Sequence, residues 1–180
     1  MADAKKIVVG LGNPGSEYEA TYHNAGMLAL RALAAALEGN GEEIIFKPHR
    51  DLFLYARGEN GGLALVIPLL YMNESGNAAK EALKKFGASP RDMIVMHDDS
   101  DLKVGSYKIA AGRGAAGHHG VESIIRTIGS GEFTRVRIGI RPPAEKTRKK
   151  AGEFVLKKIS AKDRRMFEKE VFPHIAAELL

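Results

Sequence analysis

The chain contains no cysteine among its 180 residues. Disulfide scaffolds, thiolate metal sites and cysteine nucleophiles are therefore excluded. Its apolar runs fall far short of the roughly 20 residues that a membrane-spanning helix needs. The opening MADAKKIVVG has no signal-peptide pattern, because its short apolar stretch runs directly into a glycine motif. We therefore expect a cytoplasmic protein with no membrane association.

Two common catalytic motifs are also missing. No G-x-S-x-G elbow occurs, so a serine triad of the α/β-hydrolase kind lacks its usual motif. No G-x-x-x-x-G-K-[ST] sequence occurs either, which removes the P-loop that cradles nucleotide phosphates. Any chemistry must come from other side chains.

Positive charge is present but unevenly distributed. The net charge is +5, yet residues 102–150 alone hold eleven Lys and Arg against three Glu, a local surplus of +8. Such a surplus suits a polyanionic partner bound through phosphate contacts. It equally suits a solvated surface with no specific role. The basic run at residues 141–150 likewise has two interpretations, a mobile flap near a site or a solvated loop.

Alternating strand and helix patterns predict an α/β fold, a single domain over residues 1–180 with a mixed, mostly parallel β-sheet flanked by helices. Glycines at residues 58–62 predict a hairpin between two of the strands. The expected strands are residues 5–9, 43–47, 52–57, 63–67, 93–97, 105–110 and 135–140. The expected helices are residues 25–37, 74–86 with Asn73 as a cap, 121–128, and a final amphipathic helix from a Ser160 cap to residue 180.

The first glycine motif is Gly10-Leu11-Gly12-Asn13-Pro14-Gly15, which follows a strand and matches G-x-G-x-x-G. A dinucleotide cofactor would need a helix to start at once, to hold the pyrophosphate. Pro14-Gly15 favours a turn instead, and the next helix is expected about ten residues later. A tight turn explains the glycines, but not why Asn13 stands at its apex, where its amide could face a ligand.

Polar residues follow the strands elsewhere in the chain. His23 lies just before the first helix, where a cap or a packed side chain is the plain alternative to a catalyst. His97-Asp98-Asp99-Ser100-Asp101 is expected to form a loop after a buried strand, a common position for catalytic carboxylates. These acids could instead bind a metal together with His118 and His119. Those two histidines end the glycine-rich loop at residues 112–120, which suits backbone approach and anion binding.

In their order along the chain, these motifs resemble the bacterial-type peptidyl-tRNA hydrolase family. The resemblance covers residues 8–156. The segments that carry it are VGLGNPG at residues 9–15, Tyr18, HNAG at 23–26, Pro68, YMNESG at 71–76, HDDSDL at 97–102, GHHG at 117–120 and RVRIGI at 135–140.

The resemblance implies a function and a set of site residues. The function is hydrolysis of the ester between peptide and tRNA, with His23 as general base, Asp98 as the carboxylate that holds it, and no cofactor or metal. The residues implied at the ester and the peptide are Asn13 and Asn73. The residues implied to bind the tRNA acceptor stem and 3′ end are Tyr18, Tyr71, His118, His119 and, at the 5′-phosphate, Arg137.

The sequence departs from the family at three places. His119 stands where the family usually has Asn, and Ala116 replaces a glycine. Ala110 replaces a Lys that pairs with the basic residue at position 137 in some members, so Lys108 or Arg113 would have to substitute.

Other functions stay open beside this one: a metal-dependent hydrolase, a general esterase and a non-catalytic RNA-binding relative. Because no exposed apolar stripe stands out, we expect a monomer.

Overall fold

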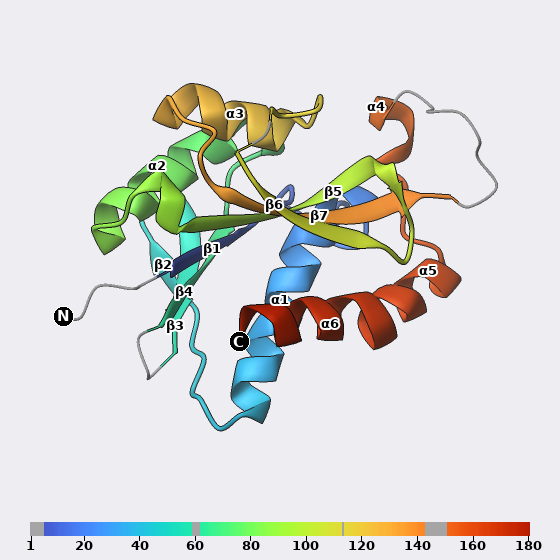
Figure 1. Cartoon of the computed structure of the whole chain (residues 1–180), viewed down its shortest axis with the longest axis horizontal. Helices are drawn as coiled ribbons and strands as arrows, with labels where there is room; N and C mark the ends of the chain where they lie inside the picture. The colour runs from blue at the N-terminus through green and yellow to red at the C-terminus, as the bar shows by residue number, and fades with distance from the viewer. Residues whose placement is uncertain (1–5, 59–61, 113, 143–150) are drawn as a thin grey trace.

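A seven-stranded mixed sheet forms the centre of the molecule (Figure 1). This computed structural model describes residues 6–58, 62–112, 114–142 and 151–180. The strand order is β2-β3-β4-β1-β5-β7-β6. The strands are β1 (Lys6–Gly10), β2 (Lys47–His49), β3 (Phe53–Arg57), β4 (Leu63–Pro68), β5 (Met93–Lys103), β6 (Tyr107–Ala111) and β7 (Thr134–Arg141).

The four central strands run parallel, and antiparallel strands complete both sides. β1 pairs in parallel with β4 and β5, and β5 pairs in parallel with β7. The β2–β3, β3–β4 and β6–β7 pairs are antiparallel. The predicted fold class and the predicted hairpin are confirmed, although residues 59–61 of its turn lie outside the described part of the chain. Since the four parallel strands point the same way, their carboxyl ends share one edge, where sites form in open α/β sheets.

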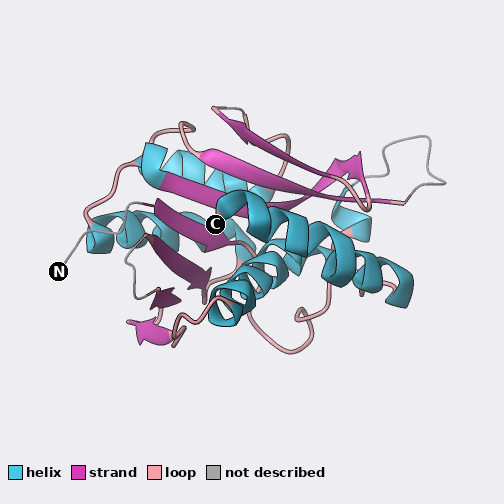
Figure 2. Cartoon of the chain, turned by 60° about the horizontal axis from the view of Figure 1, so that its bottom comes forward, coloured by secondary structure: helices cyan, strands magenta, loops and turns pink. Residues whose placement is uncertain are grey.

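Helices cover both faces of this sheet. The main helices are α1 (Ala25–Gly39), α2 (Ser75–Phe86), α3 (His119–Ile128) and a C-terminal run that contains α5 (Ala161–Met166) and α6 (Phe172–Leu179). One face packs against α1 and the C-terminal helices, the other against α2 and α3. Figure 1 separates the two layers, and Figure 2 shows the C-terminal helices crossing in front of the strands. A short helix, α4 (Ala151–Phe154), precedes that run.

The last helix agrees with its prediction at the start and differs inside. Ser160 Oγ accepts the backbone N–H of Asp163 at 3.1 Å, as expected of a cap. Between α5 and α6 the chain makes one π-helical turn, Phe167–Val171. Pro173, just beyond it, has no N–H to donate and its ring would crowd the preceding turn, which accounts for the wider helix there.

Three predicted elements are wrong in place or extent. The strand expected at residues 43–47 is absent, and β2 starts at Lys47 instead, because buried Ile44 packs into the core beside α1. Asn73 does not cap a helix: it lies exposed in a 3-10 turn, η2 (Met72–Glu74), that leads into α2. Residues 98–101, expected as a loop, continue strand β5, in which Asp98, Asp99 and Lys103 pair with β7 around a register shift.

Among the residues that the structure describes, no helix has the length and apolar character needed to cross a membrane.

Candidate active site

The turn after β1 brings His23 to the carboxyl edge of the sheet. His23 lies in a short 3-10 turn, η1 (Tyr22–Asn24), directly before α1. Gly26, in the first turn of α1, makes this approach possible. A Cβ on Gly26 would lie 2.1 Å from the carbonyl oxygen of Met96 in β5, closer than any real side chain permits. The glycine of the HNAG motif therefore lets the helix start against the strand that carries Asp98.

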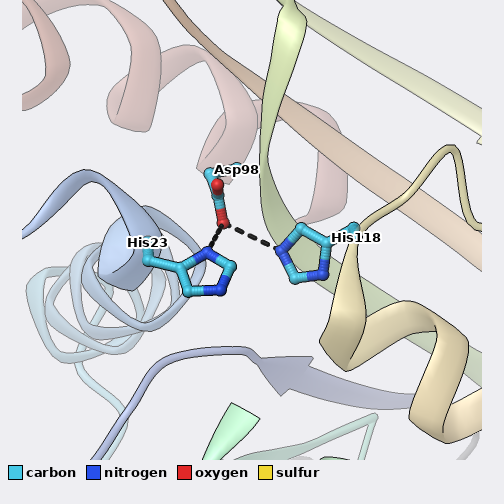
Figure 3. A group of neighbouring side chains, drawn as sticks. All are labelled: His23, Asp98 and His118. Carbon is cyan, nitrogen blue, oxygen red and sulfur yellow. Dashed lines mark hydrogen bonds and ion pairs between the residues drawn. The ribbon is translucent and has the colours of Figure 1, made fainter. Parts of the chain in front are cut away.

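His23 and Asp98 form a buried pair. Nδ1 of His23 lies 2.9 Å from Oδ1 of Asp98, and the two side chains are 9 % and 3 % exposed. Figure 3 shows both His23 and His118 directed at this one carboxylate. A carboxylate can only accept, so Nδ1 of His23 donates and its lone pair is on Nε2.

His118 is the second partner of Asp98. Its Nε2 lies 2.9 Å from the same Oδ1 atom. Its Nδ1 accepts the backbone N–H groups of Gly120 and Val121 at 3.1 and 3.3 Å, so the ring caps α3. Because Nδ1 accepts, the ring proton is on Nε2, which donates to Asp98. The predicted place of His118 was on the RNA; its described contacts are to the carboxylate and to its own helix.

Asp98 is ionised, and a third imidazole beside it, that of His97, is neutral. Burial raises the pKa of the Asp98 carboxyl, but His118 and His23 outweigh burial and hold that pKa well below its ordinary value. His97 donates from Nδ1 to the carbonyl of Asp98 at 2.7 Å. Burial and then the neighbouring His118 lower the pKa of His97 from 6.5 to about 3, so this ring is neutral at pH 7. Asp98 thus remains ionised beside imidazoles.

Asn13 has a structural task at the apex of the glycine turn. Its Oδ1 accepts the N–H of Met72 at 2.8 Å, which satisfies the first N–H of η2 in place of a local cap. The side chain of Asn24 bonds the N–H and carbonyl of Asn13 at 2.8 and 3.0 Å. With Oδ1 occupied, the amide Nδ2 is the donor that Asn13 can offer to a ligand. A cavity of about 410 Å³ is lined by Asn13 and Asn24 together with apolar side chains that include Ile67.

Tyr18 and Tyr71 lie together, as two rings at 6.4 Å in an edge-to-face arrangement. Tyr71 is 53 % exposed, so much of its side chain is accessible to a binding partner. Asn73 is exposed in the next turn of the chain. His119 is exposed as well, with Nδ1 3.7 Å from Glu122 Oε2. His119 also lines the cavity of about 120 Å³ that contains His23.

Arg137, in β7, is the direct neighbour of His97 in the parallel β5–β7 ladder. Its Nε donates to Oδ2 of Asp99 at 2.6 Å, an ion pair that is mostly buried. It lines a cavity of about 310 Å³ with His97, Asp99 and Ala116, which also line the cavity around His23. Lys108 is directly opposite Arg137 in the β6–β7 ladder, and opposed residues project to the same face. Lys108 therefore fits the substitute role; Arg113 and residues 143–150 lie outside the described residues.

The sequence analysis named two further residues without predicting the contacts that they make. Asp99 pairs with Arg137, and Asn24 holds the Asn13 loop. A separate partner for Asp99 would have been expected had residues 98–101 been recognised as strand, since side chains alternate along a strand. Nothing in the sequence indicated that Asn24 bonds Asn13, because the two residues lie in different turns.

The fold and the site define a hydrolytic enzyme of the α/β class. Its site combines a histidine held by a buried aspartate with cationic and aromatic side chains at the carboxyl edge of the sheet. The sequence comparisons agree: the family model for peptidyl-tRNA hydrolase matches residues 7–179. The chain belongs to the peptidyl-tRNA hydrolase family.

Individual relatives give the extent of the similarity. The chain is 40 % identical over 162 residues to the peptidyl-tRNA hydrolase of Sorangium cellulosum, covering 88 % of this chain and 70 % of that protein. It is 43 % identical over 143 residues to that of Aquifex aeolicus, covering 78 % and 72 %. The crystal structure of peptidyl-tRNA hydrolase from Acinetobacter baumannii superposes with a TM-score of 0.83 at 30 % identity, covering 99 % of this chain and 89 % of that one.

Proposed function

We propose that this chain hydrolyses the ester bond of peptidyl-tRNA, releasing the peptide and free tRNA. The observation that carries the proposal is the buried His23 Nδ1–Asp98 Oδ1 contact at 2.9 Å, in a chain of this family. An ester is already activated toward water, so the reaction needs chiefly a base and a stabilised oxyanion.

In this mechanism His23 is the general base. Its Nε2 lone pair takes a proton from water as the water attacks the ester carbonyl, a role typically worth about 10²–10⁴-fold in rate. Asp98 keeps the ring in the tautomer that leaves Nε2 free, and it stabilises the imidazolium as it forms. His118 donates to the same carboxylate oxygen and so fixes the orientation of Asp98.

The negative charge that develops on the ester carbonyl oxygen needs a hydrogen-bond donor. We propose Nδ2 of Asn13, whose orientation is set by the bond between its Oδ1 and the N–H of Met72. The backbone of the glycine-rich loop is the other source of donors, since Ala115, Ala116 and Gly117 line the same cavity as His23. We propose that the cavity lined by Asn13 holds the peptide and that Asn73, exposed in η2, contacts the same part of the substrate.

The RNA would lie on the aromatic and basic side of the site. Tyr18 and Tyr71 offer faces for the unpaired bases of the tRNA 3′ end, and base–aromatic stacking is worth about 1–3 kcal/mol per base. His119 is exposed and lines the cavity that contains His23, and it is proposed to contact the tRNA 3′ end as well. Arg137, with Lys108 opposite, is proposed for the 5′-phosphate. Such contacts predict binding that weakens as salt increases.

A metal-dependent hydrolase is the second candidate, because His23, Asp98 and His118 place donor atoms within 4.8 Å of one another. The hydrogen bonds disfavour it. Metal-binding histidines donate from the nitrogen that does not bind the metal. His118 instead accepts two N–H groups there, so its Nε2 carries a proton and has no lone pair for an ion. We therefore propose a reaction without a metal.

The described surface supports a monomer. No two of its large exposed apolar side chains are neighbours in the sequence, and single exposed apolar residues are ordinary on monomeric proteins. They are Ile45, Tyr71, Ile109, Leu156 and Leu180.

Release of labelled peptide from peptidyl-tRNA tests the proposal. Wild-type protein should release it, His23→Ala should lose about 10²-fold or more in kcat, and exhaustive chelation should change nothing. Full activity in His23→Ala would exclude the base, and activity lost on chelation and restored by a metal ion would favour the second candidate. A short ester without RNA serves as the comparison substrate, because equal turnover of both would indicate a general esterase.

A further inference from the structure

The turn that carries His23 is bound to a segment from the far end of the chain. The N–H of His23 donates to the carbonyl of Val155 at 2.8 Å, and the N–H of Ile159 donates to the carbonyl of Ala20 at 2.8 Å. An isolated antiparallel bridge joins the same two segments between these bonds. We call residues 155–159 the C-terminal strap. The backbone on which the proposed base is mounted is therefore paired with this strap as well as with its own helix.

The side chain of Tyr22 joins η1 to the start of the final helix. Its hydroxyl donates to Oδ2 of Asp163 at 2.6 Å and accepts the N–H of Ser160 at 3.3 Å. Its ring stacks on Phe154, with centroids 4.5 Å apart and planes at 27°. Burial and then the bond to Asp163 raise the pKa of Tyr22, so the hydroxyl stays a neutral donor.

Asp163 is itself a fixed point. Its backbone N–H donates to Ser160 Oγ, the cap of the last helix, so the carboxylate that receives Tyr22 is in the first helical turn. Tyr22 is 4 % exposed and directly precedes His23. A rigid line of contacts thus runs from the C-terminal helix through one hydroxyl to the residue beside the base.

We propose that Tyr22 is a positioning residue for the hydrolytic reaction: its hydroxyl bond to Asp163 holds the backbone of His23 so that the imidazole stays aligned on Asp98. This inference rests on the proposed function. It assigns a catalytic consequence to a tyrosine that touches neither ester nor RNA. Since a 1 Å misplacement of a reacting group can cost about 10²-fold in rate, partial release of this turn should be visible in kcat.

The chain offers a matched control. Tyr107 also joins the sheet region to the C-terminal helices through its hydroxyl, which donates to Oε1 of Glu178 at 2.5 Å. Tyr107 lies in β6, away from η1 in the chain. Tyr22→Phe and Tyr107→Phe each remove one hydroxyl–carboxylate bond to the same helical run, but only the first adjoins His23.

Steady-state hydrolysis of peptidyl-tRNA is measured for both variants, with thermal unfolding alongside. Tyr22→Phe should lower kcat about tenfold and leave KM within about twofold, whereas Tyr107→Phe keeps wild-type kcat. Asp163→Asn retains an acceptor oxygen and should stay close to wild type, while Asp163→Ala should match Tyr22→Phe. In a His23→Ala background, Tyr22→Phe should change the residual single-turnover rate by less than about twofold, because the base through which it acts is gone.

Equal kcat losses in the two tyrosine variants, or an undiminished effect of Tyr22→Phe in the His23→Ala background, would reduce Tyr22 to a general anchor and overturn the inference. So would wild-type kcat in Tyr22→Phe. If Tyr22→Phe does not fold, the Asp163 pair decides by the same criteria. The proposed function fails separately, through absent wild-type activity or full activity in His23→Ala alone.

Discussion

His97 should make the protein lose stability in mild acid. The ring is 2 % exposed, and its folded pKa of about 3 lies far below the 6.5 of an ordinary histidine. Because the folded pKa is lowered, the contribution of His97 to stability is complete above pH 6.5 and is lost as the pH falls from there toward 3. In that window the unfolded chain binds a proton that the folded chain refuses.

The size of the loss follows from the two pKa values. One proton gives a limiting slope of about 1.4 kcal/mol per pH unit. Integrated from pH 7 to pH 5, the loss is about 2 kcal/mol, a large share of the stability of a domain of this size. Asp98 adds little in this window, because its pKa is also lowered and its contribution is lost only below its ordinary range of about 4.

Urea unfolding at pH 7, 6 and 5 at constant ionic strength measures this loss. In His97→Asn the amide Nδ2 can take the place of Nδ1 and donate to the Asp98 carbonyl. The variant loses ring contacts at every pH, but its pH dependence should be shallower than that of wild type by about 2 kcal/mol over the range. His174→Asn is the control, because that ring also bonds a carbonyl from Nδ1, that of Glu170 at 2.6 Å, but at the surface. Parallel pH curves for wild type and His97→Asn would refute the reasoning.

Three further outcomes are expected. Asp98→Asn keeps the shape of the side chain but removes its negative charge, and it leaves the ring N–H groups of His23 and His118 with one amide oxygen. In this variant kcat should fall about 10²–10⁴-fold with KM little changed. A loss under tenfold would contradict the role of Asp98. Asn13→Ala leaves the N–H of Met72 without its acceptor and should cost about 1–3 kcal/mol in the free energy of unfolding. Asn13→Asp keeps that acceptor, so chemical denaturation should show a smaller loss of stability than for Asn13→Ala. The rate of peptide release should fall at least as much in Asn13→Asp as in Asn13→Ala. Equal stability of the two variants would exclude Asn13 as the acceptor that stabilises this turn. Ala116 has φ of 50°, a left-handed conformation, so Ala116→Gly should raise the free energy of unfolding by about 0.5–1 kcal/mol, and a decrease in chemical denaturation would argue against strain there.

Periodicity and turn chemistry predicted most of the fold. β1, α1 and the β3–β4 hairpin lie within a residue or two of their expected bounds. Each has a local cause: β-branched runs, helical spacing of apolar residues, and glycines at the turn. The wrong predictions have tertiary causes. Residues 98–101 look like a polar loop, yet they are strand because β7 pairs with Asp98, Asp99 and Lys103 around a register shift that no local pattern reveals. Local preference also made Asn73 a cap, whereas the N–H at that turn is bonded by Asn13, from 59 residues away in sequence.

The candidate residues came from resemblance, and the geometry adds what resemblance lacked. Spacing could not disclose that His118 shares an oxygen with His23, because the two histidines reach it from different helix starts. It could not disclose the Tyr22–Asp163 bond either, which joins residues 141 apart in the chain. Both are products of chain packing, which a single sequence does not display.

The two adjacent carboxylates of β5, Asp98 and Asp99, bind different partners. Asp98 receives the two histidines, while Asp99, the next residue along an extended strand, pairs with Arg137. Side chains alternate along a strand, so one peptide unit directs Asp98 to the two histidines and Asp99 to Arg137. Under the proposed function, substitutions at Arg137 or Lys108 should therefore change RNA binding and leave the His23–Asp98 pair intact. A shift of β5 by one residue would turn each of these carboxylates to the opposite face of the sheet and break both sets of contacts.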